Sequence, residues 1–554
     1  MGIRALLVQN PATSPWIAQR QWEPPSVALA TIAAQIDNHD VRVADAAVWR
    51  RHAGQRFLHT LARLRPAVVG FSAMTFQYDT ALRLAALARQ SDPEVLTCLG
   101  GYHATLFAEE IAAGPDARYW DFLVRGEGDR LFGELLDAVE SERADLGGIL
   151  GLSWRRDGRF VHNARRPLEN LDRLRIPARD KRITRGFHMY FRPADVIETS
   201  RGCVHGCSFC SIHEMYGTSF RVFPRDRVLA DIEDAYSRGA RHILCTDDNI
   251  TLDMDRFEEL LDGVISLKLH NLVFTTQASP TGFAQRPGIA ARMVEAGFVS
   301  VFLGIENVSA KSLRAMRKPN TVETIRRGVA ELLSRDINVS AGLINGLPHD
   351  DQDSIRENYE FVKSLGVSSV MDQLLTPYPK TPLRKEMIES GLVANRDDFR
   401  WYDGYFSNVR TEHLSAAQLG FVRWKTRREV IGMWRATRSD WKFLRGYALV
   451  WEFGLRYLVW LNERMLQWIL GVEGRYKLQM RQYLRLNDLG IDIEGLPPRP
   501  SYHPVFGTAD DPVRQSRSAL LRRRLPAAVP PSAQPPVSRT PSREPGRTRR
   551  RRSE

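Results

Sequence analysis

The sequence predicts an α/β protein in which two parallel sheets are followed by helices and a basic tail. Short apolar runs alternate with segments whose apolar residues recur at helical spacing, and this alternation occurs twice along the chain. Hydrophobic residues form 43% of the 554 residues, enough for more than one core. We expect a doubly wound, Rossmann-like domain, a connector, a partial (β/α)6 TIM-like barrel, a mostly helical region and a disordered Arg/Pro-rich tail, over residues 1–145, 146–190, 191–390, 391–498 and 499–554.

The first series predicts buried parallel strands. Their apolar runs cover residues 3–10, 41–45, 67–73, 94–101 and 121–128. Between them, stretches such as "TALRLAALARQ" have the apolar spacing of helices. A doubly wound sheet binds its ligand beyond the carboxyl ends of its strands, and glycines there let the backbone approach a large flat ligand closely. The residues at these ends are 9–11, 72–75, 100–103 and 125–128.

The second series predicts six parallel strands, which suits a partial barrel. These strands cover residues 195–200, 242–248, 272–278, 299–306, 339–346 and 368–377. In such barrels the loops after the strands carry the function. The connector before them contains a predicted hairpin, "GLSWRRDGRFVHN", whose two-residue turn is Asp157-Gly158.

Residues 390–498 are rich in Trp, Tyr, Leu and Arg, and we expect them to be mostly helical. Charged residues interrupt their longest apolar run, which rules out a simple membrane span. We interpret this run as a helix of a C-terminal cap. Surface contact with a membrane and an apolar substrate wall are the alternatives.

The positive charge of the chain is concentrated at its end. Residues 511–554 hold twelve arginines against three acidic residues, so +9 of the net charge of +13 lies in this Pro-rich tail. A segment with so few large apolar groups is expected to be disordered and solvated. Contact with anionic lipid or RNA is the alternative, and the tail does not indicate specific nucleic-acid binding.

Three of the five cysteines are crowded into "SRGCVHGCSFCSIHEMYG", residues 200–217, directly after the first barrel strand. Cys203, Cys207 and Cys210 have the spacing C-x3-C-x2-C. Three thiolates on one tight loop can bind three irons of a [4Fe–4S] cube and leave the fourth iron open. A zinc site that also uses His205 or His213 is the alternative. A chance cluster is disfavoured by its place at the end of a barrel strand.

The other two cysteines, Cys98 and Cys245, fall inside predicted strands and are expected to be buried core thiols. Five cysteines do not make a disulfide framework in a chain of this length, so metal or redox chemistry is favoured. We find no secretory signal after Met1 and no uncharged apolar run long enough for a membrane span. We therefore expect a cytoplasmic protein, with peripheral contact at the inner face of the membrane as an alternative.

Residues 190–390 resemble the radical S-adenosylmethionine (radical SAM) superfamily. In that family the three-cysteine loop carries a [4Fe–4S] cluster, whose open iron binds the amine and carboxylate of SAM. The stretches "TDDN" (246–249), "GIENVS" (304–309) and "GLINGLP" (342–348) resemble the family's SAM-binding strand ends. The resemblance therefore implies that Cys203, Cys207 and Cys210 bind the cluster and that SAM is bound by Phe209, Asp247, Asp248, Asn249, Glu306, Gly342 and Gly346.

The amino-terminal domain resembles the cobalamin-binding domain that precedes the barrel in one large radical SAM subclass. "VVGFSAMT", "LGGYHATLFAEEI" and "LVRGEGDRLFGELL" occur in the order usual for that subclass. The D-x-H-x-x-G motif that supplies a histidine to cobalt in other cobalamin enzymes is missing, so the resemblance implies cobalamin without an imidazole ligand. Some members keep this fold without cobalamin, which is the alternative. The implied cobalamin residues are Ser72, Gly100, Gly101, Gly126, Glu127 and His103, the last as a hydrogen-bonding partner.

These resemblances imply a cobalamin-dependent radical SAM methyltransferase that acts on an unactivated carbon. An electron from a flavodoxin- or ferredoxin-like donor would cleave SAM to a radical that abstracts a substrate hydrogen, and the carbon radical would take a methyl group from methylcobalamin. The cysteine loop, "TDDN" and the aromatic C-terminal region look most like hopanoid C-3 methylase-type proteins, which implies a small apolar substrate such as a polycyclic lipid. The alternatives are an oxidative cyclase of the magnesium-protoporphyrin ester type, a natural-product methylase, and an RNA- or membrane-binding protein without enzymatic activity.

Overall fold

The structure is a computed structural model, and it describes residues 2–11, 22–141, 145–190, 192–431 and 447–486 together with residues 491, 493, 496, 502, 503 and 505. Apart from the last three of these positions, the predicted disordered tail, residues 499–554, lies outside the described residues. In the described part, two sheets carry separate hydrophobic cores.

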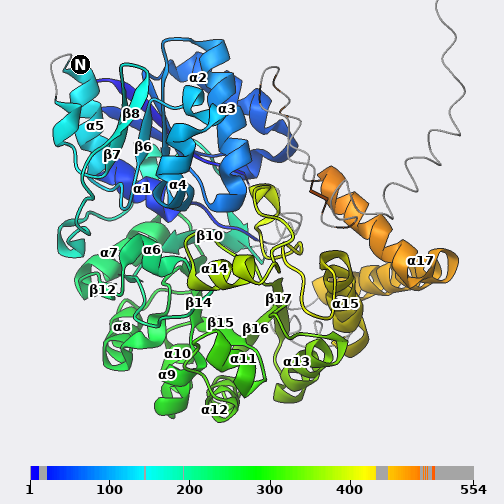
Figure 1. Cartoon of the computed structure of the whole chain (residues 1–554). Helices are drawn as coiled ribbons and strands as arrows, with labels where there is room; N and C mark the ends of the chain where they lie inside the picture. The colour runs from blue at the N-terminus through cyan, green and yellow to red at the C-terminus, as the bar shows by residue number, and fades with distance from the viewer. Residues whose placement is uncertain are drawn as a thin grey trace, which may run out of the picture. The chain divides into compact units, whose positions relative to one another are not determined.

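The first sheet is doubly wound, as predicted. Its parallel strands lie in the spatial order β3-β1-β4-β5-β6, so the strand order reverses between β1 and β4. The apolar strands are buried because helices cover both faces of the sheet (Figure 1). The strands are β1 Arg4–Gln9, β3 Asp40–Asp45, β4 Val68–Ser72, β5 Leu96–Gly100 and β6 Phe122–Val124, and the helices are α1 Val27–Ala34, α2 Ala53–Leu64, α3 Tyr78–Ser91, α4 Tyr102–Ala113 and α5 Leu131–Glu140.

The predicted hairpin forms strands β7 Leu152–Arg156 and β8 Arg159–His162. Asp157 and Gly158 both have positive φ, 51° and 79°, as a type I′ turn requires. Strand β7 pairs antiparallel with β6. The hairpin therefore extends the first sheet, although we expected it in a connector.

The second sheet contains a half-barrel of parallel strands, as predicted. Among the described residues six strands lie side by side in chain order: β10 Arg192–Ile197, β13 His242–Cys245, β14 Val273–Ala278, β15 Phe298–Glu306, β16 Asn338–Asn345 and β17 Ser369–Leu374. Two short strands, β9 His188–Met189 and β2 Trp22–Glu23, prolong the sheet beyond β10 with antiparallel pairing. A separate ribbon consists of β11 Ser200–Arg201 and β12 Arg221–Val222.

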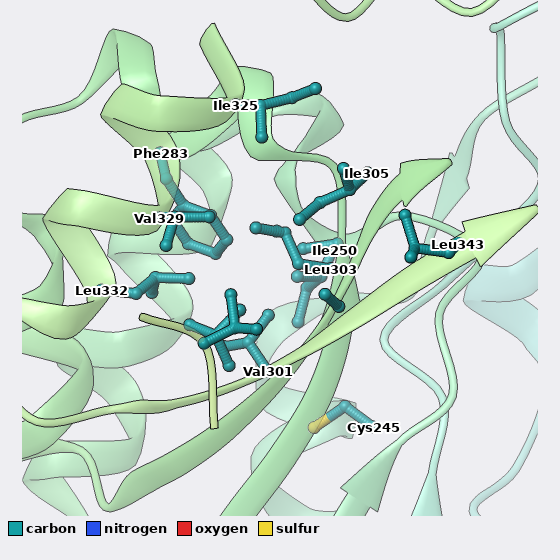
Figure 2. Close-up of a cluster of buried hydrophobic side chains, with 14 of the residues drawn as sticks. Cys245, Ile250, Phe283, Val301, Leu303, Ile305, Ile325, Val329, Leu332 and Leu343 are labelled. Carbon is teal, nitrogen blue, oxygen red and sulfur yellow. The ribbon is translucent and has the colours of Figure 1, made fainter. Parts of the chain in front are cut away.

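Helices alternate with the strands of the half-barrel and pack against the sheet (Figure 1). They are α6 Ile212–Tyr216, α7 Arg225–Ser237, α8 Met254–Ser266, α9 Pro280–Gln285, α10 Ile289–Glu295, α11 Ala310–Ala315, α12 Val322–Leu333, α13 Gln352–Leu365 and α14 Pro382–Glu389. In Figure 2, Val301, Leu303 and Ile305 of β15 lie on the side of the strand that faces Val329 and Leu332 of α12. These β15 residues alternate along the strand, because successive side chains point to opposite faces.

The two isolated cysteines are buried free thiols, as predicted. Cys245 is 2% exposed and belongs to the core of the half-barrel, where Figure 2 shows its sulfur. Cys98 is equally buried in the first domain. Burial raises the pKa of both thiols, so neither is a reactive thiolate at neutral pH.

Helices α15 Ala416–Val430 and α17 Tyr447–Leu486 confirm the helical C-terminal region. Helix α17 is interrupted at Gly471, whose φ is +68°. Aromatic residues of this region form a separate small cluster that contains Tyr405, Trp424 and Tyr476. In the described part of the chain, no helix combines the length and the apolar character that crossing a membrane requires.

Candidate functional site

The cysteine loop follows β10 and is preceded by the short strand β11. Because β11 pairs antiparallel with β12, residues 202–220 form a loop that is closed at its base. The turn into the loop requires glycine: Gly202 has a φ of +89°, and a Cβ there would lie 2.3 Å from the carbonyl oxygen of Ser219. The loop carries the three clustered thiols, all partly buried and none in a disulfide: Cys203, Cys207 and Cys210.

Two consecutive aspartates after β13 hold the start of this loop. Asp247 is fully buried and accepts hydrogen bonds from the backbone N–H and the hydroxyl of both Thr199 and Ser200. Asp248 accepts a hydrogen bond from the backbone N–H of Gly202 at 2.8 Å. Burial raises the pKa of Asp248 to about 6, although the Gly202 hydrogen bond opposes the shift. Asp247 therefore fixes the backbone, and Asp248 lies against the cysteine loop itself.

Asn249, the third polar residue of this strand end, is engaged in local structure. Its side-chain oxygen accepts hydrogen bonds from the hydroxyl of Thr251 at 2.8 Å and from the backbone N–H of Ser279 at 3.0 Å. It thus joins the end of β13 to the end of β14. The geometry gives Asn249 a structural role beside the SAM contact that we predicted.

Three further predicted SAM residues have packing roles. A Cβ at Gly342 would lie 2.7 Å from the ring of Phe302, and one at Gly346 would lie 2.8 Å from Leu419. Gly346 also has a φ of +105°, which only glycine adopts readily. Phe209, within the cysteine loop, packs against the core of the half-barrel. Packing alone therefore explains these glycines, and their contact with SAM stays a prediction.

Glu306, at the end of β15, forms an ion pair beside the cysteine loop. Its carboxylate accepts a hydrogen bond from the ammonium of Lys318 at 2.8 Å, and both side chains are 12% exposed. Burial opposes the ammonium charge, but Glu306 and the thiols of Cys207 and Cys210 raise the pKa of Lys318. Glu306 has a φ of +68°, and such strain is typical of functional sites. Sequence reasoning missed Lys318 because it follows a helix, not a strand.

A cavity lies at the carboxyl ends of the strands of the first sheet, and we call it the sheet-end cavity. It contains about 700 Å³ of unfilled space, part of which is open to solvent. Part of its lining is apolar and comes from the first domain, including Leu7, Ile32, Gly70, Val124 and Phe132. Another part is polar and draws on both domains, with Glu127, Asp129, Glu198, Arg201 and Tyr216. The cavity therefore reaches from the first sheet to the cysteine loop.

The sheet-end cavity brings together five of the six predicted cobalamin residues, namely Ser72, Gly100, Gly101, Gly126 and Glu127. A Cβ at Gly126 would meet nothing within 4 Å, so the glycine leaves open space there. At Gly101 the backbone itself requires glycine, because its φ of 87° and ψ of −167° fall in a region essentially restricted to glycine. The glycines thus form a smooth cradle at the end of the sheet.

His103 does not line the cavity. Its side chain is buried, stacked on Tyr78 at 4.1 Å between ring centroids, and flanked by Phe107 and Phe399. Burial lowers the pKa of His103 to about 3, so its ring is neutral. Helix α4 begins at Tyr102 and buries His103 in this aromatic cluster. The hydrogen bond to cobalamin that we predicted for His103 is not supported by this position.

The clustered thiols are protonated at neutral pH in the protein alone. Burial raises the pKa of Cys203, Cys207 and Cys210, and the value for Cys210 is about 12. Iron would displace these protons, because a coordinating thiol is deprotonated. The described residues form no group of three or more His, Cys, Asp or Glu that could hold one metal ion. A [4Fe–4S] cube does not require such a group, because it binds each thiolate through a different iron. The zinc site with His205 or His213 stays the alternative.

Family models match both halves of this arrangement. Residues 197–362 match the model of the radical SAM superfamily, and residues 15–136 match that of the B12 binding domain. The chain therefore combines a radical SAM domain with a B12-binding domain. These two domains indicate a [4Fe–4S] cluster, SAM and cobalamin as the cofactors.

Individual proteins support the same assignment. An uncharacterized methyltransferase of Pyrococcus horikoshii is 28% identical over 71% of this chain and 85% of its own length. The hopanoid C-3 methylase of Methylococcus capsulatus is 26% identical over 77% and 80%. The anaerobic magnesium-protoporphyrin IX monomethyl ester cyclase of Rubrivivax gelatinosus is 25% identical over 59% and 59%. The fold resembles that of the radical SAM methyltransferase TsrM from Kitasatospora setae, solved with cobalamin and a [4Fe–4S] cluster, at a TM-score of 0.58 and 19% identity over 71% and 79% of the two chains.

The residues present fit these cofactors. Three reduced thiols on one loop are the donor set that a cluster with an open iron requires. The sheet-end cavity offers a glycine cradle with open space beside Gly126 and apolar walls for a large flat ligand.

Proposed function

We propose that the chain is a cobalamin-dependent methyltransferase that methylates an unactivated carbon of a small apolar molecule. The observation that carries this proposal is the lining of the sheet-end cavity, which combines Gly100 and Gly126 of the first domain with Met215 and Tyr216 of α6. A ligand in this cavity would lie next to the helix that follows the cysteines. The proposed chemistry is reductive cleavage of SAM, abstraction of a substrate hydrogen and transfer of a methyl group supplied by cobalamin.

The residues of the chain would orient SAM beside the cysteines. Asp248 is a carboxylate next to the cysteine loop and suits the positively charged amine of SAM. Lys318 suits the carboxylate of SAM, and Glu306 would hold the Lys318 ammonium in place as well as accept hydrogen bonds. These groups are largely buried, and exclusion of water strengthens each charged contact.

The apolar nature of the proposed substrate is supported by helix α17. Around the interruption at Gly471 it presents exposed apolar side chains, and Trp468 is 87% exposed. Apolar helix surfaces with Trp are typical of segments that rest in a membrane interface. We propose that the protein works in the cytoplasm in peripheral contact with the membrane, where a polycyclic lipid would be available. The exposed residues are Met465, Trp468, Ile469, Leu470 and Val472.

The electron donor is proposed to be a flavodoxin- or ferredoxin-like protein with an acidic surface. In the cysteine loop, the hydroxyl of Ser208 donates a hydrogen bond to the carbonyl oxygen of Ala315 at 3.2 Å, and its backbone N–H donates one to that of Met316 at 2.9 Å. The same segment exposes three cations that would attract such a donor: Lys311, Arg314 and Arg317.

The proposal is tested by the mass of the product. Protein reconstituted anaerobically with iron, sulfide and hydroxocobalamin is reduced and supplied with SAM and a lipid extract from a host that lacks the chain. A methyltransferase adds one methylene unit of mass per transfer. An oxidative cyclase, supported as the second candidate by the related cyclase above, forms a product without that gain. A reconstituted protein with full iron content that does not cleave SAM would refute both.

A further inference from the structure

Arg201 connects the cysteine loop to the wall of the sheet-end cavity. It stands two residues before Cys203 and is 4% exposed. Asp129 accepts hydrogen bonds from both terminal nitrogens of the guanidinium, at 2.9 and 3.1 Å. Glu127 accepts one from Nη1 at 2.9 Å, and Glu198 accepts two, from Nε at 3.2 Å and Nη2 at 3.0 Å. The five N–H groups of this guanidinium are thereby all directed at carboxylates.

The carboxylates around Arg201 come from both domains. Glu127 and Asp129 follow β6 of the first sheet, Glu198 follows β10 of the half-barrel, and all three line the sheet-end cavity. Arg221 also binds Glu127, with hydrogen bonds of 2.9 and 3.0 Å to its two carboxylate oxygens.

The two arginines hold both ends of the cysteine loop. Arg201 belongs to β11 and Arg221 to β12, the two strands that close the loop at its base. Both strands are therefore fastened to Glu127, a residue of the cavity wall. Buried ion pairs of this kind add little net stability compared with apolar contacts, but they can specify one geometry. The network is thus suited to set the position of the loop.

We propose that Arg201 and Arg221 couple the binding of cobalamin to the binding of SAM. A ligand in the sheet-end cavity would restrict Glu127 and Asp129, and these carboxylates position the ribbon that carries the cysteine loop. Arg201 is accordingly a positioning residue that acts through the cavity wall. The inference rests on the proposed function, because it requires cobalamin in this cavity. Since coupling is reciprocal, each ligand tightens the binding of the other by the same factor.

The chain contains a matched control for Arg201. Arg179 is 6% exposed and also donates hydrogen bonds to three carboxylates, those of Asp195, Asp231 and Asp234. None of these four residues lines the sheet-end cavity. A substitution at Arg179 therefore disturbs a buried arginine that also has three carboxylate partners, but these partners lie away from the proposed connection.

The experiment compares wild-type protein, Arg201→Lys and Arg179→Lys. Lysine keeps the charge but cannot reproduce the planar fork of arginine. The affinity for SAM is measured on the full-length, cluster-loaded protein with and without bound hydroxocobalamin. We expect cobalamin to tighten SAM binding roughly fivefold or more in wild type and Arg179→Lys, and to have almost no effect in Arg201→Lys. The paramagnetic spectrum of the reduced cluster with SAM should respond to cobalamin in the same two proteins only.

A second variant approaches the network from the cavity side. Glu127→Gln keeps the shape of the side chain and removes the charge that both arginines share, so it should also abolish the effect of cobalamin on SAM affinity. It provides the test if Arg201→Lys does not fold. An effect of cobalamin that persists in the folded variants, or that is absent from wild type loaded with both cofactors, overturns the coupling. Wild type that binds SAM but retains no cobalamin would overturn the proposed function itself.

Discussion

Gly100 is the last residue of β5 and lines the sheet-end cavity. A larger side chain at this position would enter the cavity without straining the backbone. A Cβ at this position would lie 3.7 Å from the Cβ of Val124 and 3.9 Å from the carbonyl oxygen of Phe71, which are ordinary contacts. Both of these neighbours line the cavity. Valine suits the end of a strand, so we expect Gly100→Val to fold and to bind its cluster.

The added methyl groups should weaken the binding of cobalamin and leave the stability of the free protein nearly unchanged. Extra methyl groups in a filled, well-packed space cost about 1–3 kcal/mol. The cavity without its ligand has room for them, so the free energy of unfolding should change little. Because about 1.4 kcal/mol corresponds to a factor of ten, the dissociation constant of cobalamin should rise roughly 5- to 150-fold.

Gly101→Ala is the matched control, because this substitution should destabilise the folded protein itself. A Cβ at Gly101 would lie 2.9 Å from the carbonyl oxygen of Ala73, and the backbone conformation is unfavourable for alanine. This variant should lose roughly 1–3 kcal/mol of stability. The assay combines titration with hydroxocobalamin, retention through gel filtration and thermal unfolding of both variants. Cobalamin affinity of Gly100→Val equal to that of wild type would refute the placement of cobalamin in this cavity.

Replacement of Cys203, Cys207 or Cys210 by Ala should abolish the brown absorbance of the cluster and all SAM cleavage. By contrast, Cys245→Ala should lower the free energy of unfolding by only about 1 kcal/mol. Persistent SAM cleavage by a triple-Ala protein would contradict the cluster assignment. His103→Phe should resist acid better than wild type, measured as the acid midpoint of the circular dichroism signal. Burial lowers the pKa of His103 from 6.5 to about 3, so the unfolded chain binds a proton that the folded chain does not, and stability is lost as the pH falls through this range; an identical midpoint would count against this account. Removal of residues 511–554 should leave iron content and SAM cleavage unchanged, because the segment has little to bury, and a loss of iron would show a structural role.

The features that local patterns encode were predictable, and those that depend on distant residues were not. The apolar runs of β1 and β15 are sufficient to predict strands, and the Asp157-Gly158 pair predicts the turn between β7 and β8. The cysteine spacing similarly identifies one loop. By contrast, Arg201 meets Glu127 across 74 positions of sequence, and neither residue stands in a pattern that indicates the other.

The position of His103 likewise depends on residues that are distant in sequence. A polar residue just after a glycine-rich strand end is a reasonable ligand candidate, but α4 buries its side chain among aromatic rings. The direction of one side chain at the start of a helix is set by tertiary packing. Tertiary packing also explains why Lys318 was not predicted. It lies beside the thiols only because the chain after α11 folds back onto the cysteine loop.

Strand β2 has a consequence for how this protein can be made and divided. It is formed by Trp22 and Glu23, which precede most of the first sheet in sequence, yet it pairs with β9 in the second sheet. During synthesis these residues leave the ribosome long before His188 and Met189, so they have no partner until most of the first domain has emerged. A half-barrel expressed without the start of the chain would present the outer edge of β9 unpaired, and such edges promote association between molecules. The two domains therefore form an interlaced unit, and gene fusions or recombinants that join them at residues 145–190 would separate a strand from its sheet.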